Sequence, residues 1–204
     1  MEIILDEQRM KNFAEMKQKR TNELQQLEKW TGLQCAELLF DSDVDDWNEC
    51  TSVFNERIVG KSKLVFLIED KDGEIFGYYL NTKVVEKYLW SNQQETDKNS
   101  FEFNLQSHGR LKEPMKFEIK DLEKGGIHLY EKSDIGNGNN GYYLVCLGDI
   151  HLKKRHQRNT SYCNQHGSYF DYHGIEKALC GKTGSRNNSG EKFTVKRIVV
   201  IQMK

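Results

Sequence analysis

Two cysteines and two histidines near the end of the sequence are the residues best suited to bind a metal ion. They are Cys163, His166, His173 and Cys180, in the spacing Cys-x2-His-x6-His-x6-Cys. All four are ligand types for tetrahedral zinc. The separations differ from those of a standard zinc finger, and a single Cys or His is usually packed or solvated. We therefore expect no cofactor, with a structural zinc ion at these four residues as the alternative.

A cluster of basic residues precedes this group. Lys153, Lys154, Arg155 and Arg158 lie within six positions of the sequence. Aromatic residues follow them, namely Tyr162, Tyr169, Phe170 and Tyr172. Basic and aromatic side chains together can neutralise a phosphate backbone and stack on bases, although a solvated loop beside buried aromatics gives the same pattern. Because unpaired buried charges are costly, we expect a solvent-exposed loop from Lys153 onward, and any polyanion or acidic protein to bind there.

Other short motifs lack residues that their chemistry requires. Gly60-Lys61-Ser62 and Gly181-Lys182-Thr183 match the end of a phosphate-binding loop, but Asn55 and Glu176 stand where that loop needs its first glycine. No Gly-x-Ser-x-Gly or His-Glu-x-x-His motif occurs. We therefore predict a non-catalytic protein. The enzymatic alternative is a peroxide-consuming thiol catalyst, which needs an exposed cysteine with thiolate character.

The charge of the chain is divided unevenly along its length. The 204 residues carry a net charge of −1, but residues 1–150 carry −9 and residues 151–204 carry +8. Such a division is typical of an acidic part that faces a basic part within one fold. It is also typical of a surface for a polyanion, so a nucleic-acid-binding regulatory protein is the alternative function.

The sequence shows no signal for secretion or membrane insertion. It has no apolar run of about 18 residues, and its N-terminus has no basic segment followed by an apolar one. Its cysteines number five, which is odd, so reduced thiols are expected. We expect a cytoplasmic or nuclear protein that is neither secreted nor inserted into a membrane.

The N-terminal segment has the composition of a helix. Residues 5–30 contain no Gly or Pro and are rich in helix-forming residues, up to a stop at Thr31-Gly32. Ile3 and Met10 occupy position a of a heptad repeat. Polar residues interrupt the apolar seam of this repeat, so the pattern is weak for a coiled coil. We expect a helix over residues 1–31 that docks on a domain of residues 32–204, or that pairs with a second copy in a homodimer.

The rest of the chain reads mainly as strands. Asp43 has the sequence context of an N-cap for a helix that ends at Gly60. The expected strands are 36–40, 63–69, 74–80, 101–105, 115–119, 126–130, 142–152 and 193–203. Strands joined by turns, with few helices between them, favour a mainly β or α+β fold built as an antiparallel β-sandwich with a few flanking helices and an N-terminal helix.

The order of several segments resembles the TLDc domain family. Ala36-Glu37-Leu38-Leu39-Phe40 is similar to the opening of the family, and Ile75-Phe76-Gly77-Tyr78-Tyr79 to its Phe-Gly-Gly-Tyr hairpin. Phe101-Glu102-Phe103-Asn104-Leu105 and Gly148-Asp149-Ile150-His151-Leu152 are similar to later strands of the family. The segment from Phe193 to Ile201 resembles its ending. The resemblance covers the chain from residue 33 to residue 204.

The resemblance implies a fold and a role. The implied fold is a two-sheet antiparallel β-sandwich with a few helices. The implied role is that of an interaction module linked to the oxidative-stress response, with subunits of the vacuolar proton-pumping ATPase as partners. The family has no settled catalytic chemistry. The chain departs from the family pattern at Tyr142 to Leu147, where a glycine-rich run is replaced, and at Arg197 and Val199, which replace acids.

Overall fold

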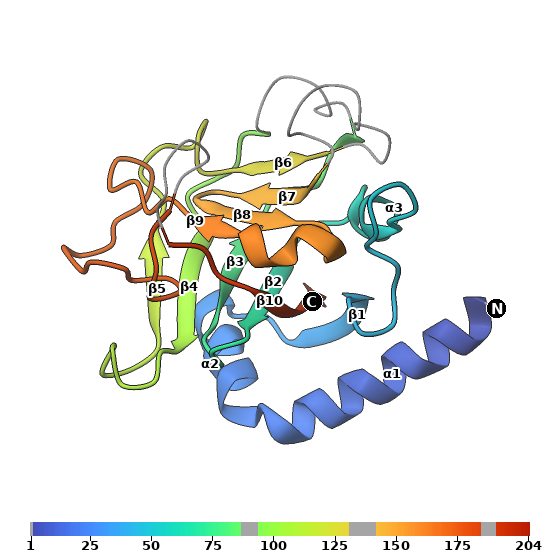
Figure 1. Cartoon of the computed structure of the whole chain (residues 1–204). Coiled ribbons are helices and arrows are strands. Elements are labelled where there is room, and N and C mark those ends of the chain that lie inside the picture. The colour runs from blue at the N-terminus through green and yellow to red at the C-terminus, as the bar shows by residue number, and fades with distance from the viewer. Residues whose placement is uncertain (1, 87–93, 131–141, 185–190) are drawn as a thin grey trace.

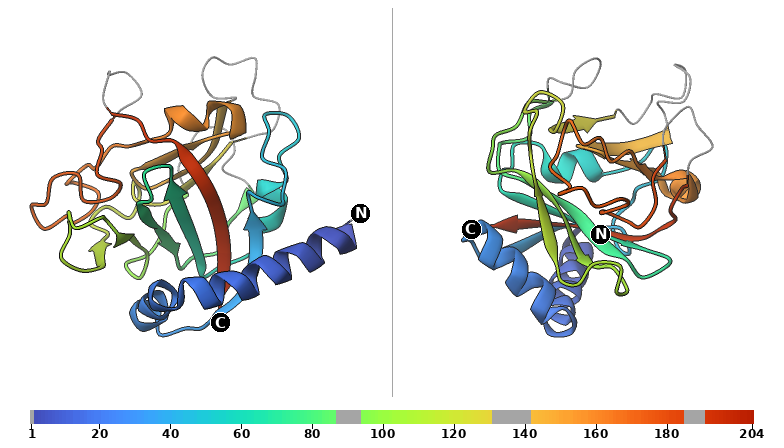
Figure 2. Two further views of the ribbon diagram at one scale, coloured as in Figure 1. Left: turned by 60° about the horizontal axis from the view of Figure 1, so that its bottom comes forward. Right: turned by 90° about the vertical axis from the view of Figure 1, so that its left-hand side faces the viewer.

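Two antiparallel sheets and a pair of helices form the structure, which is a computed structural model that describes residues 2–86, 94–130, 142–184 and 191–204 (Figure 1). The sheets have six and four strands. The helices cover the face of the larger sheet that points away from the smaller one (Figure 2). The prediction of a mainly β, two-sheet antiparallel sandwich with flanking helices is confirmed.

The larger sheet has the strand order β1-β10-β2-β3-β4-β5. Its strands are β1 (Cys35–Asp41), β2 (Leu64–Asp70), β3 (Ile75–Leu80), β4 (Phe101–Gln106), β5 (Met115–Glu118) and β10 (Val195–Met203). The last strand along the chain, β10, lies between β1 and β2 (Figure 2). Central strands such as β2 are buried on both faces, which explains the continuous apolar run of their sequences.

The smaller sheet has the order β6-β7-β8-β9. Its strands are β6 (Ile127–Leu129), β7 (Tyr143–Leu147), β8 (Ile150–Lys153) and β9 (Tyr162–Cys163). The prediction of one strand over residues 142–152 is wrong, because the chain turns back at Gly148 and Asp149 to pair β7 with β8. Gly148 adopts φ +55°, and Glu102 accepts the backbone N–H of Asp149 at 2.8 Å. These two features fix a turn that the apolar run conceals.

The N-terminal segment forms two helices where one was predicted. α1 spans Glu2–Lys19 and α2 spans Thr21–Thr31. They meet at Arg20, whose guanidinium pairs with Glu69 of β2. α2 ends as expected at Gly32, which has φ +71° and donates its N–H to the carbonyl of Glu28 at 2.8 Å.

The helix predicted from Asp43 is also wrong. Turns follow β1, and only a short helix, α3 (Phe54–Ile58), forms before Gly60. The acids here satisfy backbone groups of the turn, since Asp45 accepts the N–H of Asp41 at 2.8 Å and Asp41 accepts that of Asp43 at 3.1 Å. Short acidic side chains therefore stabilise a turn where a helix cap was expected.

The apolar core has two layers. One layer lies between the sheets, where Phe76 and Tyr78 of β3 and the buried Phe170 form a cluster with Leu144 and Leu147 of β7. The other lies between the larger sheet and the helices, where Leu24 and Leu27 of α2 are buried. The larger sheet is thus covered on both faces.

Candidate functional site

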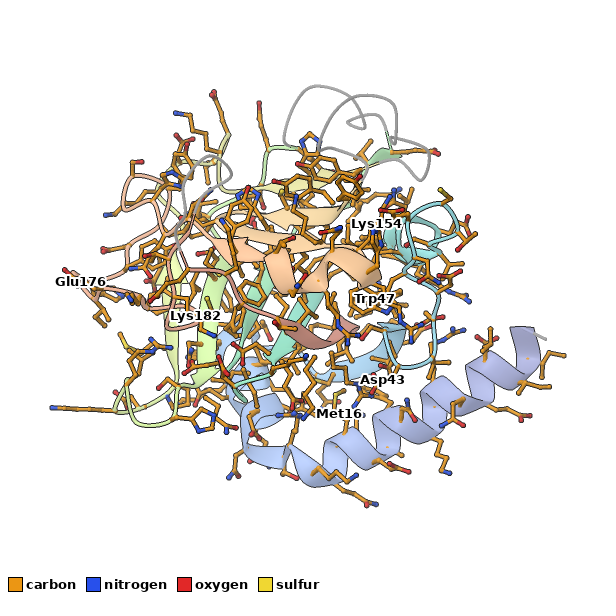
Figure 3. The ribbon with its side chains drawn as sticks, in the orientation of Figure 1. Met16, Asp43, Trp47, Lys154, Glu176 and Lys182 are labelled. Carbon is orange, nitrogen blue, oxygen red and sulfur yellow. The ribbon has the colours of Figure 1, made fainter. Side chains whose placement is uncertain are left out.

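Two of the four predicted basic residues are buried. Lys153 ends β8 and is 8% exposed, and its ammonium lies 3.0 Å from the centre of the Tyr143 ring. Lys154 is 1% exposed and donates from Nζ to the carbonyl oxygen of Glu49 at 2.8 Å. The backbone N–H of Arg155, the next residue after Lys154, donates to the carbonyl of Trp47 at 3.2 Å, and Figure 3 labels Lys154 and Trp47 in this region. The expectation of a solvent-exposed stretch is therefore wrong at these two lysines, because an aromatic face and a carbonyl replace water around their charged ends.

The accessible part of the basic cluster lies in a short 3-10 helix, η4 (Arg155–Thr160). Arg155 is exposed there and Arg158 is half-buried. His156 faces Glu49, so an acid already lies beside this helix. Binding of an anion or an acidic protein by Arg155 and Arg158 stays a prediction.

The four candidate metal ligands lie at three different places. The buried thiols of Cys163 and Cys180 contact each other between the sheets. His166 faces Asp149, with its Nδ1 2.6 Å from Oδ1, and His173 lies near Glu118. Within the part of the chain that the structure describes, no group of three or more Cys, His, Asp or Glu side chains is placed to hold a metal ion.

A polar cluster that the sequence did not reveal joins the two sheets. Glu102 of β4 and Asp149 of the β7–β8 turn are almost fully buried. The hydroxyl oxygen of Tyr172 lies 2.6 Å from Glu102 Oε2 and 2.7 Å from Asp149 Oδ2. Asp149 also accepts the backbone N–H of His166 at 2.5 Å. This set of four residues, here called the inter-sheet cluster, connects β4 to the smaller sheet.

The number of protons in the inter-sheet cluster follows from its geometry. A phenol has one proton and can donate it to one of its two carboxyl neighbours, so the other neighbour must donate to the phenol oxygen. Burial, together with the nearby Asp149, raises the pKa of Glu102 well above its ordinary value. A protonated Glu102 can donate to Tyr172, whose own proton then points to Asp149, and His166 can donate from Nδ1 to the other oxygen of Asp149.

Replacing His166 with Gln should remove a pH-dependent contribution to stability. The hydrogen bond to Asp149 raises the pKa of His166 above its ordinary value of 6.5, because the imidazolium pairs best with the carboxylate. A raised folded-state pKa gives stabilisation that is complete below the unfolded-state pKa and is lost as pH rises through the folded-state pKa. Thermal unfolding should be measured between about pH 5 and pH 9. The variant should be less stable than the unchanged chain at low pH, and this difference in stability should shrink as pH rises.

The matched control for this experiment is His108→Gln, because His108 is exposed and lies outside the inter-sheet cluster. Its deficit should be small at every pH. A deficit of His166→Gln that stays constant across the range would contradict the assigned ion pair with Asp149.

Polar contacts hold α1 against the larger sheet. Arg9 is 5% exposed and pairs with Asp45 and with Asp6 of its own helix. Asn12 donates to Asp41 Oδ2 at 2.7 Å, and Arg197 of β10 lies 2.6 Å from the same oxygen. Arg197, which departs from the family pattern, is thus part of the attachment of α1.

A groove runs between α1, the edge strand β1 and α3. Its volume is about 530 Å³. The walls carry mixed charges, and the apolar lining comes from Met10, Phe13, Leu38 and Leu39. Beside the groove, the first half of α1 extends past the sheet (Figure 1) and exposes Ile3, Ile4 and Met10, which are 74%, 68% and 66% accessible. We call the exposed side chains of Ile3, Ile4 and Met10, with the groove, the α1 face.

The sequence indicates Ile3 and Met10 only as positions of a weak coiled-coil heptad. Their separation of seven residues places them on one side of α1. Pairing with a second copy through this helix stays a prediction, as does the division of the chain into residues 1–31 and 32–204.

One family of known proteins is similar to the chain over nearly its whole length. The family model of the TLDc domain matches residues 2–192, which include both N-terminal helices and most of the strands. None of the curated proteins that were compared with the chain matches it. Among the helices that the structure describes, none has the length and the hydropathy needed to span a bilayer.

Proposed function

Because the chain belongs to the TLDc domain family, we propose that it is a non-catalytic interaction module of the oxidative-stress response whose partner is the vacuolar proton-pumping ATPase. The family is generally linked to oxidative stress, and several of its members bind that pump. The observation that supports a docking role is the α1 face. Large apolar side chains at this level of exposure are typical of surfaces that a partner covers.

The geometry of the α1 face suits a protein partner. Ile3 and Met10 supply exposed apolar anchors, and the adjacent groove has charged walls. An apolar centre with a polar rim is the usual composition of a protein interface. The helix itself is fixed by the buried contact of Arg9, so its exposed side chains are held in place before binding.

The variant Ile3→Asp/Met10→Asp should bind the purified pump about tenfold or more weakly than the unchanged chain, because buried apolar anchors carry most of an interface's energy. Binding would be measured by pulldown and titration with purified pump subunits. Both positions are exposed, so thermal stability should change little.

Leu122→Asp is the matched control, since Leu122 is an exposed apolar residue outside the α1 face. Equal binding by all three chains would place the docking surface elsewhere. Absence of binding by the unchanged chain would reject the pump as partner.

DNA binding stays the alternative function. The +8 charge of residues 151–204 supports it. The burial of Lys153 and Lys154 weakens it, because these two ammonium groups are held by the protein and leave Arg155 and Arg158 to contact phosphates.

A further inference from the structure

A row of four side chains crosses the outer face of the smaller sheet. His128 of β6 pairs in register with Cys146 of β7, Cys146 pairs with His151 of β8, and His151 pairs with Tyr162 of β9. Cross-strand partners project on the same side of a sheet. Cys146 and Tyr162 form a cluster separate from the core between the sheets, so the row lies on the face that points away from the larger sheet.

Cys146 lies at the centre of a thiol–imidazole–amide array. Its Sγ is 2.8 Å from Nδ1 of His151, and Nε2 of the same ring is 2.9 Å from the amide nitrogen of Asn164. The hydroxyl of Tyr130 lies 3.3 Å from Sγ. The nucleophilic cysteine of papain-like proteases has the same three types of group around it.

The amide of Asn164 sets the position of the ring proton. An amide nitrogen donates and does not accept, so Nε2 accepts and the proton lies on Nδ1, where it points at Sγ. The Tyr130 hydroxyl can donate to the same sulfur. Sγ is therefore placed to accept two hydrogen bonds, and a thiolate accepts such bonds more strongly than a thiol does.

The surroundings of the array keep the His151 ring neutral and oriented. Burial, with help from Lys153 and three further basic neighbours, lowers the pKa of His151 to about 3. The His151 ring also stacks on Tyr162 at a centroid separation of 4.4 Å, which fixes its orientation. The neutral ring therefore directs its Nδ1–H at Sγ, where this donor stabilises negative charge that develops on the sulfur.

We propose that Cys146 is a modification site at which a small hydroperoxide oxidises the thiol to a sulfenic acid. The sulfur attacks one peroxide oxygen, so an S–O bond forms and the O–O bond breaks. Sulfur is oxidised and the peroxide is reduced, and the proton lost by the thiol ends on the leaving oxygen, which departs as water or an alcohol. Cys146 is 4% exposed, and this limits the oxidant to a small molecule.

This modification is distinct from the docking proposal and does not require a partner. His151 and Asn164 act as positioning residues, because they orient a donor toward the sulfur. The other buried thiols have different neighbours. Cys163 and Cys180 contact each other, and burial, with the carboxylate of Glu28 as a further cause, raises the pKa of Cys35 to about 12. Exposed Cys50 provides an internal reference for a solvent-accessible thiol.

The test treats the full chain with hydrogen peroxide and a sulfenic-acid trap, then measures labelling at each cysteine by mass spectrometry. Cys146 should be labelled faster than Cys50, and no trap should be found at that position in Cys146→Ser. His151→Gln keeps a donor near the sulfur, whereas His151→Phe does not, so labelling should fall in the order wild type, Gln, Phe. The total loss should be about tenfold or more. Thermal unfolding shows whether each variant is folded.

Asn164→Ala should also slow labelling, and Asn159→Ala is its control because Asn159 is exposed on η4. Three results would overturn the proposal. They are faster labelling at Cys50 than at Cys146, an unchanged or increased rate at Cys146 in a folded His151→Phe protein, and a disulfide between Cys163 and Cys180 as the product in place of a sulfenic acid.

Discussion

A chain that lacks residues 1–31 should not fold into a stable domain. α2 buries Leu24 and Leu27, and α1 buries Met16, against the outer face of the larger sheet. Truncation would uncover apolar residues of that face, namely Cys35, Leu38, Val65, Leu67, Tyr79, Phe101, Phe103, Val199 and Ile201. The free-energy cost of exposing these side chains to water should exceed the net stability typical of a domain, which is roughly 5–15 kcal/mol. Thermal unfolding followed by circular dichroism should show no cooperative transition. Size-exclusion chromatography should show aggregates.

A single substitution tests the same layer without truncation. Leu27→Ala should lower the free energy of unfolding by about 2–5 kcal/mol, because Leu27 is fully buried. Gln25→Ala, an exposed position on the same helix, should change it by less than about 0.5 kcal/mol. A truncated chain that unfolds cooperatively at nearly the original temperature would show that the helices are an independent attachment.

Asp149→Ala should cost about 2–5 kcal/mol of the free energy of unfolding, because two buried donors lose their acceptor. These donors are the hydroxyl of Tyr172 and the backbone N–H of His166. The ring N–H of His166 also loses its partner but can turn to water, since this side chain is 45% exposed. Chemical unfolding by urea would measure the difference.

Glu123→Ala is the control for that measurement, because Glu123 is an exposed acid in a surface turn. Its effect should be within about 0.5 kcal/mol of zero. A loss of similar size in both variants would mean that the inter-sheet cluster does not connect the sheets energetically.

The sequence was sufficient to predict strands and their antiparallel arrangement, because alternation and turns are local properties. It was insufficient for the faces of β4. Phe101, Phe103 and Leu105 alternate with Glu102 and Asn104, a pattern typical of a strand with one face in water. Both polar residues are fully buried, because the smaller sheet covers their side. The alternation therefore identified the strand. It gave no information on which element covers the polar face of that strand.

For a similar reason, the burial of two basic residues has no sign in the sequence. Lys153 and Lys154 are buried because Tyr143 and the carbonyl of Glu49 lie across from them, and neither contact is local in sequence. Cys146 and His151 are five residues apart, and only the hairpin at Gly148 brings them face to face. A sequence read as one long strand places these two on opposite faces. A prediction of the turn at Gly148 would have placed Cys146 and His151 on the same face of the sheet.

The central position of β10 bears on how fast the chain reaches its folded state. β10 must be seated between β1 and β2, so strands from opposite ends of the described chain have to meet before the larger sheet is complete. Pairings between distant segments close long loops, and β-rich folds of this kind fold in milliseconds to seconds. Until β10 inserts, the facing edges of β1 and β2 present unpaired backbone groups to other molecules. Aggregation during refolding should therefore depend on protein concentration, even though β10 pairs with both of these strands in the finished sheet.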